Sequence, residues 1–142
     1  MGYNVAWAGD VSEKGFSWKH GIAIVPDIEY EETSGTDKER LTGLNTKDKE
    51  DLIYSFKRPV KEMEITPEMR QKEFDHYKTT DDHGMHIVGA AKDQTGNKFY
   101  IVKNSWDVDN PYDGYIYMSE TFIKYKATDI MIHKDVVPKK IA

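Results

Sequence analysis

His83 and Asn104 lie at the two ends of a predicted β-hairpin, and together they have the residue types for acid–base chemistry. Two apolar runs, residues 85–91 and 99–102, flank the turn-forming residues 93–97, which is the pattern of a hairpin. Because antiparallel strands bring the outer ends of a hairpin together, the imidazole and the carboxamide are expected within hydrogen-bond distance. A carboxamide in that place orients a histidine that acts as a base.

Other polar side chains near the hairpin are weaker candidates. His83 and His86 have the spacing of a metal-binding pair, but residues three apart on a strand point to opposite faces. Asp81 and Asp82 adjoin His83, yet neighbouring residues of an extended chain diverge, so no metal site is expected. Asp82 is instead expected to set the local polarity. Ser105 has no nucleophile-elbow sequence around it and should point away from the residue before it.

The composition is that of a folded domain. At 142 residues the chain fits a single domain, residues 1–142, large enough to bury roughly two-thirds of its unfolded surface. A hydrophobic fraction of 38%, an aromatic fraction of 12% and three tryptophans are values typical of globular proteins.

The charge balance argues against nucleic acid as a partner. The formal net charge is −5 and the sequence pI is near 5.5, so no overall field attracts a phosphate backbone. Four tyrosines could be mistaken for a platform on which bases stack, but without basic residues around them they are expected to pack in the sheet and core. These are Tyr112, Tyr115, Tyr117 and Tyr125.

Cysteine is absent from the chain. Its absence excludes disulfides, thiolate metal sites and a cysteine nucleophile. No apolar run approaches the roughly 20 residues that cross a bilayer, and the first residues show no signal-peptide pattern, so no membrane partner is expected.

The first half of the chain alternates between apolar and charged stretches. Residues 3–8 predict a short buried strand, residues 11–20 a loop, and residues 21–25 a brief apolar run stopped by Pro26. Residues 27–51 are dominated by charged side chains and hold few large apolar ones, so they predict a charged surface insertion that cannot order itself alone.

Two helices are predicted before the hairpin. Thr46 is expected to cap a short helix whose apolar face includes Leu52 and Ile53. Residues 60–65 alternate only roughly in the manner of a strand. The sequence Thr66-Pro67-Glu68 then predicts a helix start, with a hydroxyl cap, proline in the first turn and an acidic residue near the positive end of the helix dipole; the helix should run to about Tyr77.

After the hairpin, a strand is predicted at residues 115–118, a short helix capped by Ser119 after it, and a last strand at residues 130–132. Helices and strands are mixed and the strand connections are hairpins. The fold class is therefore predicted as α+β with an antiparallel sheet.

Residues 83–85 and 103–106, which open and close the hairpin, resemble the histidine and asparagine segments of papain-like cysteine peptidases. Residues 5–11, 114–119 and 136–138 resemble more specifically the bleomycin hydrolase and aminopeptidase C branch. The resemblance covers nearly the whole chain, but only what would be the C-terminal part of such an enzyme. It implies the C-terminal half of a papain-like fold: an antiparallel, barrel-like sheet with short flanking helices, whose first strand borders the substrate cleft.

The resemblance assigns roles to three residues. His83 would be the catalytic base, Asn104 the residue that orients it, and Trp106 the indole that covers their hydrogen bond and keeps water from it. The family usually has glycine where this chain has Asp107, which places the local backbone conformation in question.

The implied activity is that of a cysteine-type aminopeptidase that removes N-terminal residues from peptides without a metal or organic cofactor. An N-terminal half would supply the nucleophilic cysteine and a glutamine for the oxyanion hole, so this chain alone is expected to be inactive. The branch forms hexameric rings, which implies a homo-oligomer, and the resemblance implies a cytoplasmic location. The alternative is a stand-alone, non-catalytic module of the same fold that binds peptides or a partner chain.

Overall fold

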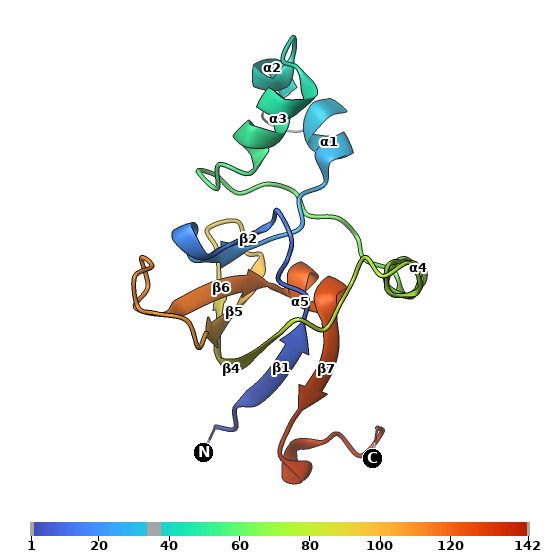
Figure 1. Cartoon of the computed structure of the whole chain (residues 1–142), viewed down its shortest axis with the longest axis vertical. Coiled ribbons are helices and arrows are strands. Elements are labelled where there is room, and N and C mark those ends of the chain that lie inside the picture. The colour runs from blue at the N-terminus through green and yellow to red at the C-terminus, as the bar shows by residue number, and fades with distance from the viewer. Residues whose placement is uncertain (1, 34–37, 142) are drawn as a thin grey trace.

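One curled sheet runs through the protein, with short helices around it (Figure 1). The structure is a computed structural model that describes residues 2–33 and 38–141. Within these residues the strand order is β2-β3-β6-β5-β4-β1-β7. The strands are β1 (Val5–Gly9), β2 (Phe16–Ser17), β3 (Ile22–Ala23), β4 (His83–Lys92), β5 (Lys98–Lys103), β6 (Tyr115–Ser119) and β7 (Ala127–Met131). The predicted α+β class is confirmed.

The predicted hairpin is present as β4 and β5. Its strands pair antiparallel from Lys92 opposite Lys98 to His86 opposite Lys103. The register shifts between Ile87 and Gly89, so one extra residue stands in β4, as in a β-bulge. β4 also begins at His83, two residues before the apolar run that predicted it, because the first residues of β4 pair with β1 instead.

The sheet is antiparallel, as predicted, except at one pair of strands. β3 pairs parallel with β6, with Ile22 opposite Tyr117 and Ala23 opposite Met118. Two residues are too few to show a strand's direction in sequence, and the partner is distant along the chain. The predicted loop at residues 11–20 likewise contains β2 and a 3-10 helix, Trp18–His20.

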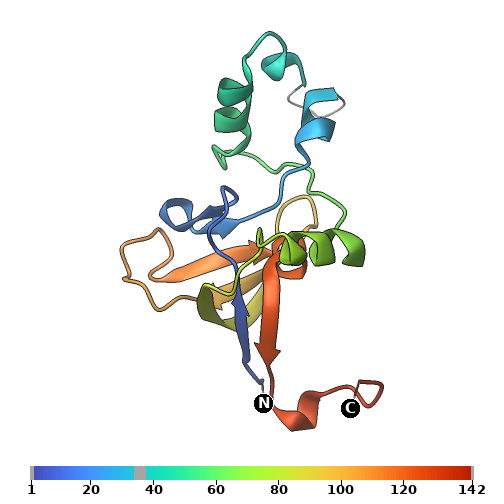
Figure 2. The same ribbon diagram turned by 45° about the vertical axis from the view of Figure 1, so that its right-hand side comes forward.

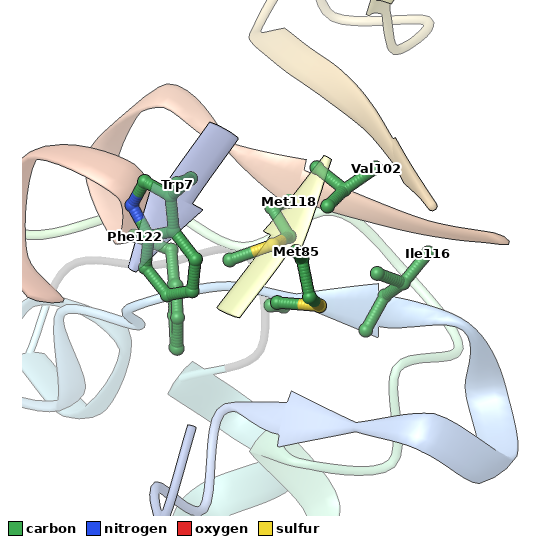
Figure 3. Close-up of a cluster of buried hydrophobic side chains, with 7 residues drawn as sticks. Trp7, Met85, Val102, Ile116, Met118 and Phe122 are labelled. Carbon is green, nitrogen blue, oxygen red and sulfur yellow. The ribbon is translucent and has the colours of Figure 1, made fainter. Parts of the chain in front are cut away.

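A cluster of buried apolar side chains fills the concave side of the sheet (Figure 3). Residues of β1, β3, β4, β5 and β6 point into it, and one side chain of helix α5 closes it. Its members are Trp7, Ala23, Met85, Val102, Ile116, Met118 and Phe122, each no more than 5% exposed. Each large member contributes about 1.5–3 kcal/mol by leaving water.

Two capped helices agree with the sequence. Helix α4 (Pro67–Asp75) has Thr66 as its cap, whose hydroxyl accepts from the Met69 amide, and helix α5 (Glu120–Lys126) has Ser119 in the same role. α4 ends at Asp75 rather than at Tyr77, since Tyr77 has a left-handed φ of 56°. The last strand comes earlier than residues 130–132, as β7, which pairs with β1.

The charged region forms three short helices at the end of the molecule away from the termini (Figures 1 and 2). They are α1 (Ile28–Thr33), α2 (Lys38–Leu41) and α3 (Thr46–Ile53); residues 28–33 and 38–57 are called the helical lobe below. Asn45, not Thr46, caps α3 by accepting from the Asp48 amide. That the region is an insertion stays a prediction.

No strand forms at residues 60–65. The segment makes an isolated bridge, Pro26 opposite Glu62, and its Met63 amide donates to the Val25 carbonyl. Its partial alternation reflects one bridge and not a ladder. No helix of the described residues is long and apolar enough to span a bilayer.

Candidate active site

The structure brings His83 and Asn104 together. His83 is the first residue of β4, paired with Gly9 of β1, and Asn104 follows the last residue of β5. The Asn104 amide donates to the Gly114 carbonyl over 3.1 Å, which continues the pairing of β5 with β6. Held by strands on both sides, the His83 Nε2 atom lies 2.7 Å from the Asn104 Oδ1 atom.

The hydrogen bonds around Asn104 determine which imidazole nitrogen carries the proton. Its Oδ1 atom also accepts from the Ser105 backbone amide at 2.7 Å, and a backbone N–H can only donate. The atom facing His83 is therefore the carbonyl oxygen, and Nε2 of His83 must be the protonated nitrogen. In the neutral ring, Nδ1 is then a free base, and no described residue hydrogen-bonds to it.

The burial of Asn104 fixes the orientation of its side-chain amide. Asn104 is 5% exposed, and its Nδ2 atom has no hydrogen-bond partner among the described residues. Turning the amide over would set an N–H group against the Ser105 N–H and the imidazole. The cost of an unpaired buried polar group, about 1–3 kcal/mol, therefore opposes the turned amide and favours the observed orientation.

Trp106 lies beside the imidazole, as the resemblance implied. Its ring centroid is 5.0 Å from that of His83, with an angle of 41° between the planes. Phe16 and Trp18 meet the Trp106 ring edge-on at 5.8 and 5.4 Å, and the Trp18 Nε1 atom donates to Asp109. Trp106 is still 44% exposed, so the indole covers one side of the imidazole and faces solvent with the other.

Asp82 makes a contact that the sequence did not predict. Its carboxylate accepts from the Val11 amide at 3.0 Å and from the Ser12 hydroxyl at 2.6 Å. Its own amide donates to the Gly9 carbonyl. Asp82 thus fixes the turn after β1 against the start of β4, next to His83. Adjacency to the histidine was the only sequence signal, because the partners lie far away along the chain.

The other candidates do not join the site. His86 and Ser105 are exposed, and His86 lies on the opposite face of β4 from His83. Within the described parts of the chain, no three metal-ligating side chains are grouped closely enough to hold an ion. Asp107 does not need the conformation of a glycine, since the non-glycine residues with positive φ are Phe56, Tyr77 and Asp113.

A hollow of about 660 Å³ lies on the outer face of the sheet and is lined in part by Asn104. Ala6, Ala8 and Gly84 have side chains too small to fill it, and Ile130 and Met131 of β7 form an exposed apolar wall. His86, Lys103 and Asp129 supply its charged or polar groups. Such a hollow can take an apolar side chain next to polar groups.

Comparison with known proteins identifies a matching family and a similar fold. The model of the peptidase C1-like family matches residues 30–142. The crystal structure of PepW from Lactobacillus rhamnosis HN001 aligns with a TM-score of 0.58 and 17% identity, over 97% of this chain and 24% of that chain. At this identity the likeness shows the fold, which is one half of a papain-like architecture. The chain spans only that minor share of the relative's length.

Proposed function

The chain belongs to the peptidase C1-like family, and from that premise we propose that it is the C-terminal part of a cysteine-type aminopeptidase similar to aminopeptidase C and bleomycin hydrolase. The observation that carries the proposal is the 2.7 Å bond from His83 Nε2 to Asn104 Oδ1, with Nδ1 left without a partner. This is the arrangement of a histidine base that waits for an acidic group.

In this proposal the acidic group is a thiol, as in a cysteine-type peptidase, and it must come from another part of the enzyme because this chain has no cysteine. A cysteine from the N-terminal half would give its S–H proton to Nδ1 of His83, and the thiolate would attack the peptide carbonyl carbon. The imidazolium would return that proton to the leaving amine as the C–N bond breaks. Water would then hydrolyse the thioester with His83 again as the base. Asn104 would hold the ring throughout, and its oxygen would favour the imidazolium.

The hollow next to Asn104 supports a peptide as substrate. It lies next to Asn104 and combines an apolar wall with small floor residues. In this proposal a substrate side chain enters the hollow while its carbonyl carbon lies on the Nδ1 side of His83. The partner is the N-terminal half, which would supply the cysteine and the opposite wall of the cleft.

Reconstitution tests the proposal. The 142-residue chain is mixed with a separately produced N-terminal half that contains the cysteine, and hydrolysis of an aminoacyl fluorogenic substrate is followed. The mixture should be active and each part alone inactive. His83→Ala should lower kcat/KM by about 10²–10⁴-fold, the usual contribution of a general base. His76→Ala, at an exposed histidine that follows α4 and does not line the hollow, is the matched control and should leave kcat/KM within about twofold.

Asn104→Ala should have a smaller effect. It removes one hydrogen bond to an imidazolium, so kcat should fall about 10–100-fold while KM changes little. Activity of the 142-residue chain alone, or an active mixture that is indifferent to His83→Ala, would refute the proposal. A mixture that binds peptides but never hydrolyses them would favour the non-catalytic module.

A further inference from the structure

Lys126, the last residue of α5, is a buried lysine that the proposed chemistry does not use. It is 1% exposed, which is rare for an ammonium group, because removing a charge from water costs several kcal/mol unless partners replace the water. It stands four residues after Phe122, on the face of α5 that packs on the sheet. A charged residue on the apolar face of a helix is the sequence signal for this buried lysine, and it was not recognised.

The partners of Lys126 come from two separate segments. Its Nζ atom lies 2.5 Å from a Glu13 carboxylate oxygen in the turn after β1. It also donates to the Thr79 hydroxyl at 3.1 Å and reaches the Lys78 carbonyl at 3.4 Å, both in the segment that leads into His83. One ammonium therefore joins the turn after β1 to the entry of the histidine.

Two carboxylates join the same two segments. Asp10, which is 3% exposed, accepts from the Thr80 amide at 3.0 Å and from the Ser12 amide at 2.8 Å. Its own amide donates to the Lys126 carbonyl at 3.1 Å. Together with Asp82, which bonds to Val11 and Ser12, these contacts fasten the approach to His83 at three successive points.

Among the described residues, Glu13 is the one carboxylate that pairs with the ammonium. Tyr125 places its ring 4.5 Å from Nζ. Burial, and then the nearby charges of Glu73 and Glu13, raise the pKa of Tyr125 to about 12, so the phenol stays neutral. A buried ion pair adds little net stability, but it strongly disfavours any arrangement that leaves the ammonium unpaired. The Lys126–Glu13 pair therefore affects the position of the segment that leads into His83 more than the stability of the fold.

We propose that Lys126 is a positioning residue for the histidine: by bridging Glu13 and Thr79 it sets where the chain enters β4, and so holds the His83 imidazole against Asn104. The inference rests on the proposed role of His83. The test measures the tautomer of the His83 imidazole and not activity. A failure of this inference can therefore be distinguished from a failure of the proposed function.

The test removes the Lys126 link with the smallest possible change. Thr79→Val keeps the shape of the buried side chain and removes the hydroxyl that accepts from Nζ, whereas Thr80→Val, at the exposed next position, is the matched control. The ring ¹⁵N shifts of His83 in the labelled chain give the fraction of each tautomer. Thr79→Val should raise the Nδ1–H fraction up to about fivefold, the factor of one ordinary hydrogen bond, and Thr80→Val should not change it.

Charge variants give an independent reading. Lys126→Arg keeps the cation and should retain the wild-type tautomer, whereas Lys126→Met should raise the Nδ1–H fraction at least as much as Thr79→Val. If Lys126→Met does not fold, Thr79→Val decides alone. A lower melting temperature with unchanged ring shifts in Thr79→Val would overturn the proposal, because Lys126 would then be a structural residue only.

The wild-type shifts separate the two proposals. A wild-type ring without the Nε2–H form would remove the His83–Asn104 pair, and both proposals would fall. A wild-type Nε2–H ring that responds to Thr79→Val, in a chain that is inactive when reconstituted, would overturn the proposed function and leave the positioning role intact.

Discussion

The sheet that carries His83 and the helical lobe differ in how they are held together. Seven core side chains, drawn from five strands of the sheet and α5, are almost fully removed from water. The lobe buries Leu41 and Ile53, at 1% and 5% exposure, among short and strongly charged helices. Dense packing fixes atoms to within fractions of an ångström, which acid–base chemistry needs, so the site lies in the sheet.

Several contacts that hold the lobe to the sheet are polar. Glu31 of α1 accepts from the Lys61 amide, and Lys14 pairs with Glu50 of α3. Glu62 of the connecting segment accepts from the Val25 amide at 2.7 Å and from the Ser119 hydroxyl at 2.6 Å. Because hydrogen bonds and exposed pairs contribute little net free energy, the lobe should open without unfolding the sheet.

The largest contrast is expected from truncating one buried side chain in each region. Met118→Ala should lower the free energy of unfolding of the whole chain by about 2–5 kcal/mol, because it leaves a cavity in the shared core. Leu41→Ala creates a cavity too, but it should open only the lobe, so that amide exchange speeds up in α1 to α3 and not in β4. Denaturant titration with hydrogen exchange measures both, and equal loss of protection in β4 would show that the regions are one cooperative unit.

A smaller contrast is expected between two helix caps. Ser119→Ala removes the cap of α5 and the donor to Glu62, so the free energy of global unfolding should fall by about 1–3 kcal/mol. Asn45→Ala removes the cap of α3, a loss of about 1 kcal/mol that should be confined to the lobe. Chemical denaturation gives the first value and amide exchange in α3 the second. A global loss from Asn45→Ala as large as that from Ser119→Ala would contradict the comparison.

The smallest effect concerns pH. Burial raises the pKa of Glu62 above 4.5, although hydrogen bonds from Ser119 and Val25 offset part of the rise. The folded state therefore holds this proton more tightly than the unfolded chain, and its contribution to stability declines as pH rises from about 4.5 through the folded-state pKa. Glu62→Gln keeps an acceptor and cannot titrate, so its stability relative to wild type should increase over that window. Parallel curves for the two proteins would show that Glu62 stays accessible to water.

Much of the sheet could be predicted because its signals are local. The hairpin has alternating apolar strands around a turn, and α4 and α5 each begin with a hydroxyl residue that serves as the cap. The closeness of His83 to Asn104 followed from the hairpin, whereas the register that pairs them depends on the bulge in β4. The parallel pairing of β3 with β6 could not be predicted, because it depends on contacts between distant short segments.

The lobe was harder to predict for the same reason. α1 and α2 have no apolar periodicity, and the burial of Leu41 depends on tertiary contacts that the local sequence does not show. At α3 two adjacent residues can both cap a helix, and the carboxamide of Asn45 prevails over Thr46 because it accepts from the Asp48 amide and donates to the Asp48 carboxylate. The burial of Lys126 was not predicted, because a lysine is expected to face water unless its position on the helix relative to the apolar residues is examined.

The extra residue in β4 decides which histidine meets the asparagine. On the turn side of Val88 the pairing aligns Gly89 with Ile101, and continued unbroken it would bring Asn104 opposite His86. Beyond Val88 the ladder is offset by one, so Asn104 falls level with Met85 and shares a face with His83. If Val88 paired with Val102 and the ladder ran on without a bulge, every reactive group would still be in the chain, yet the carboxamide would meet the wrong imidazole.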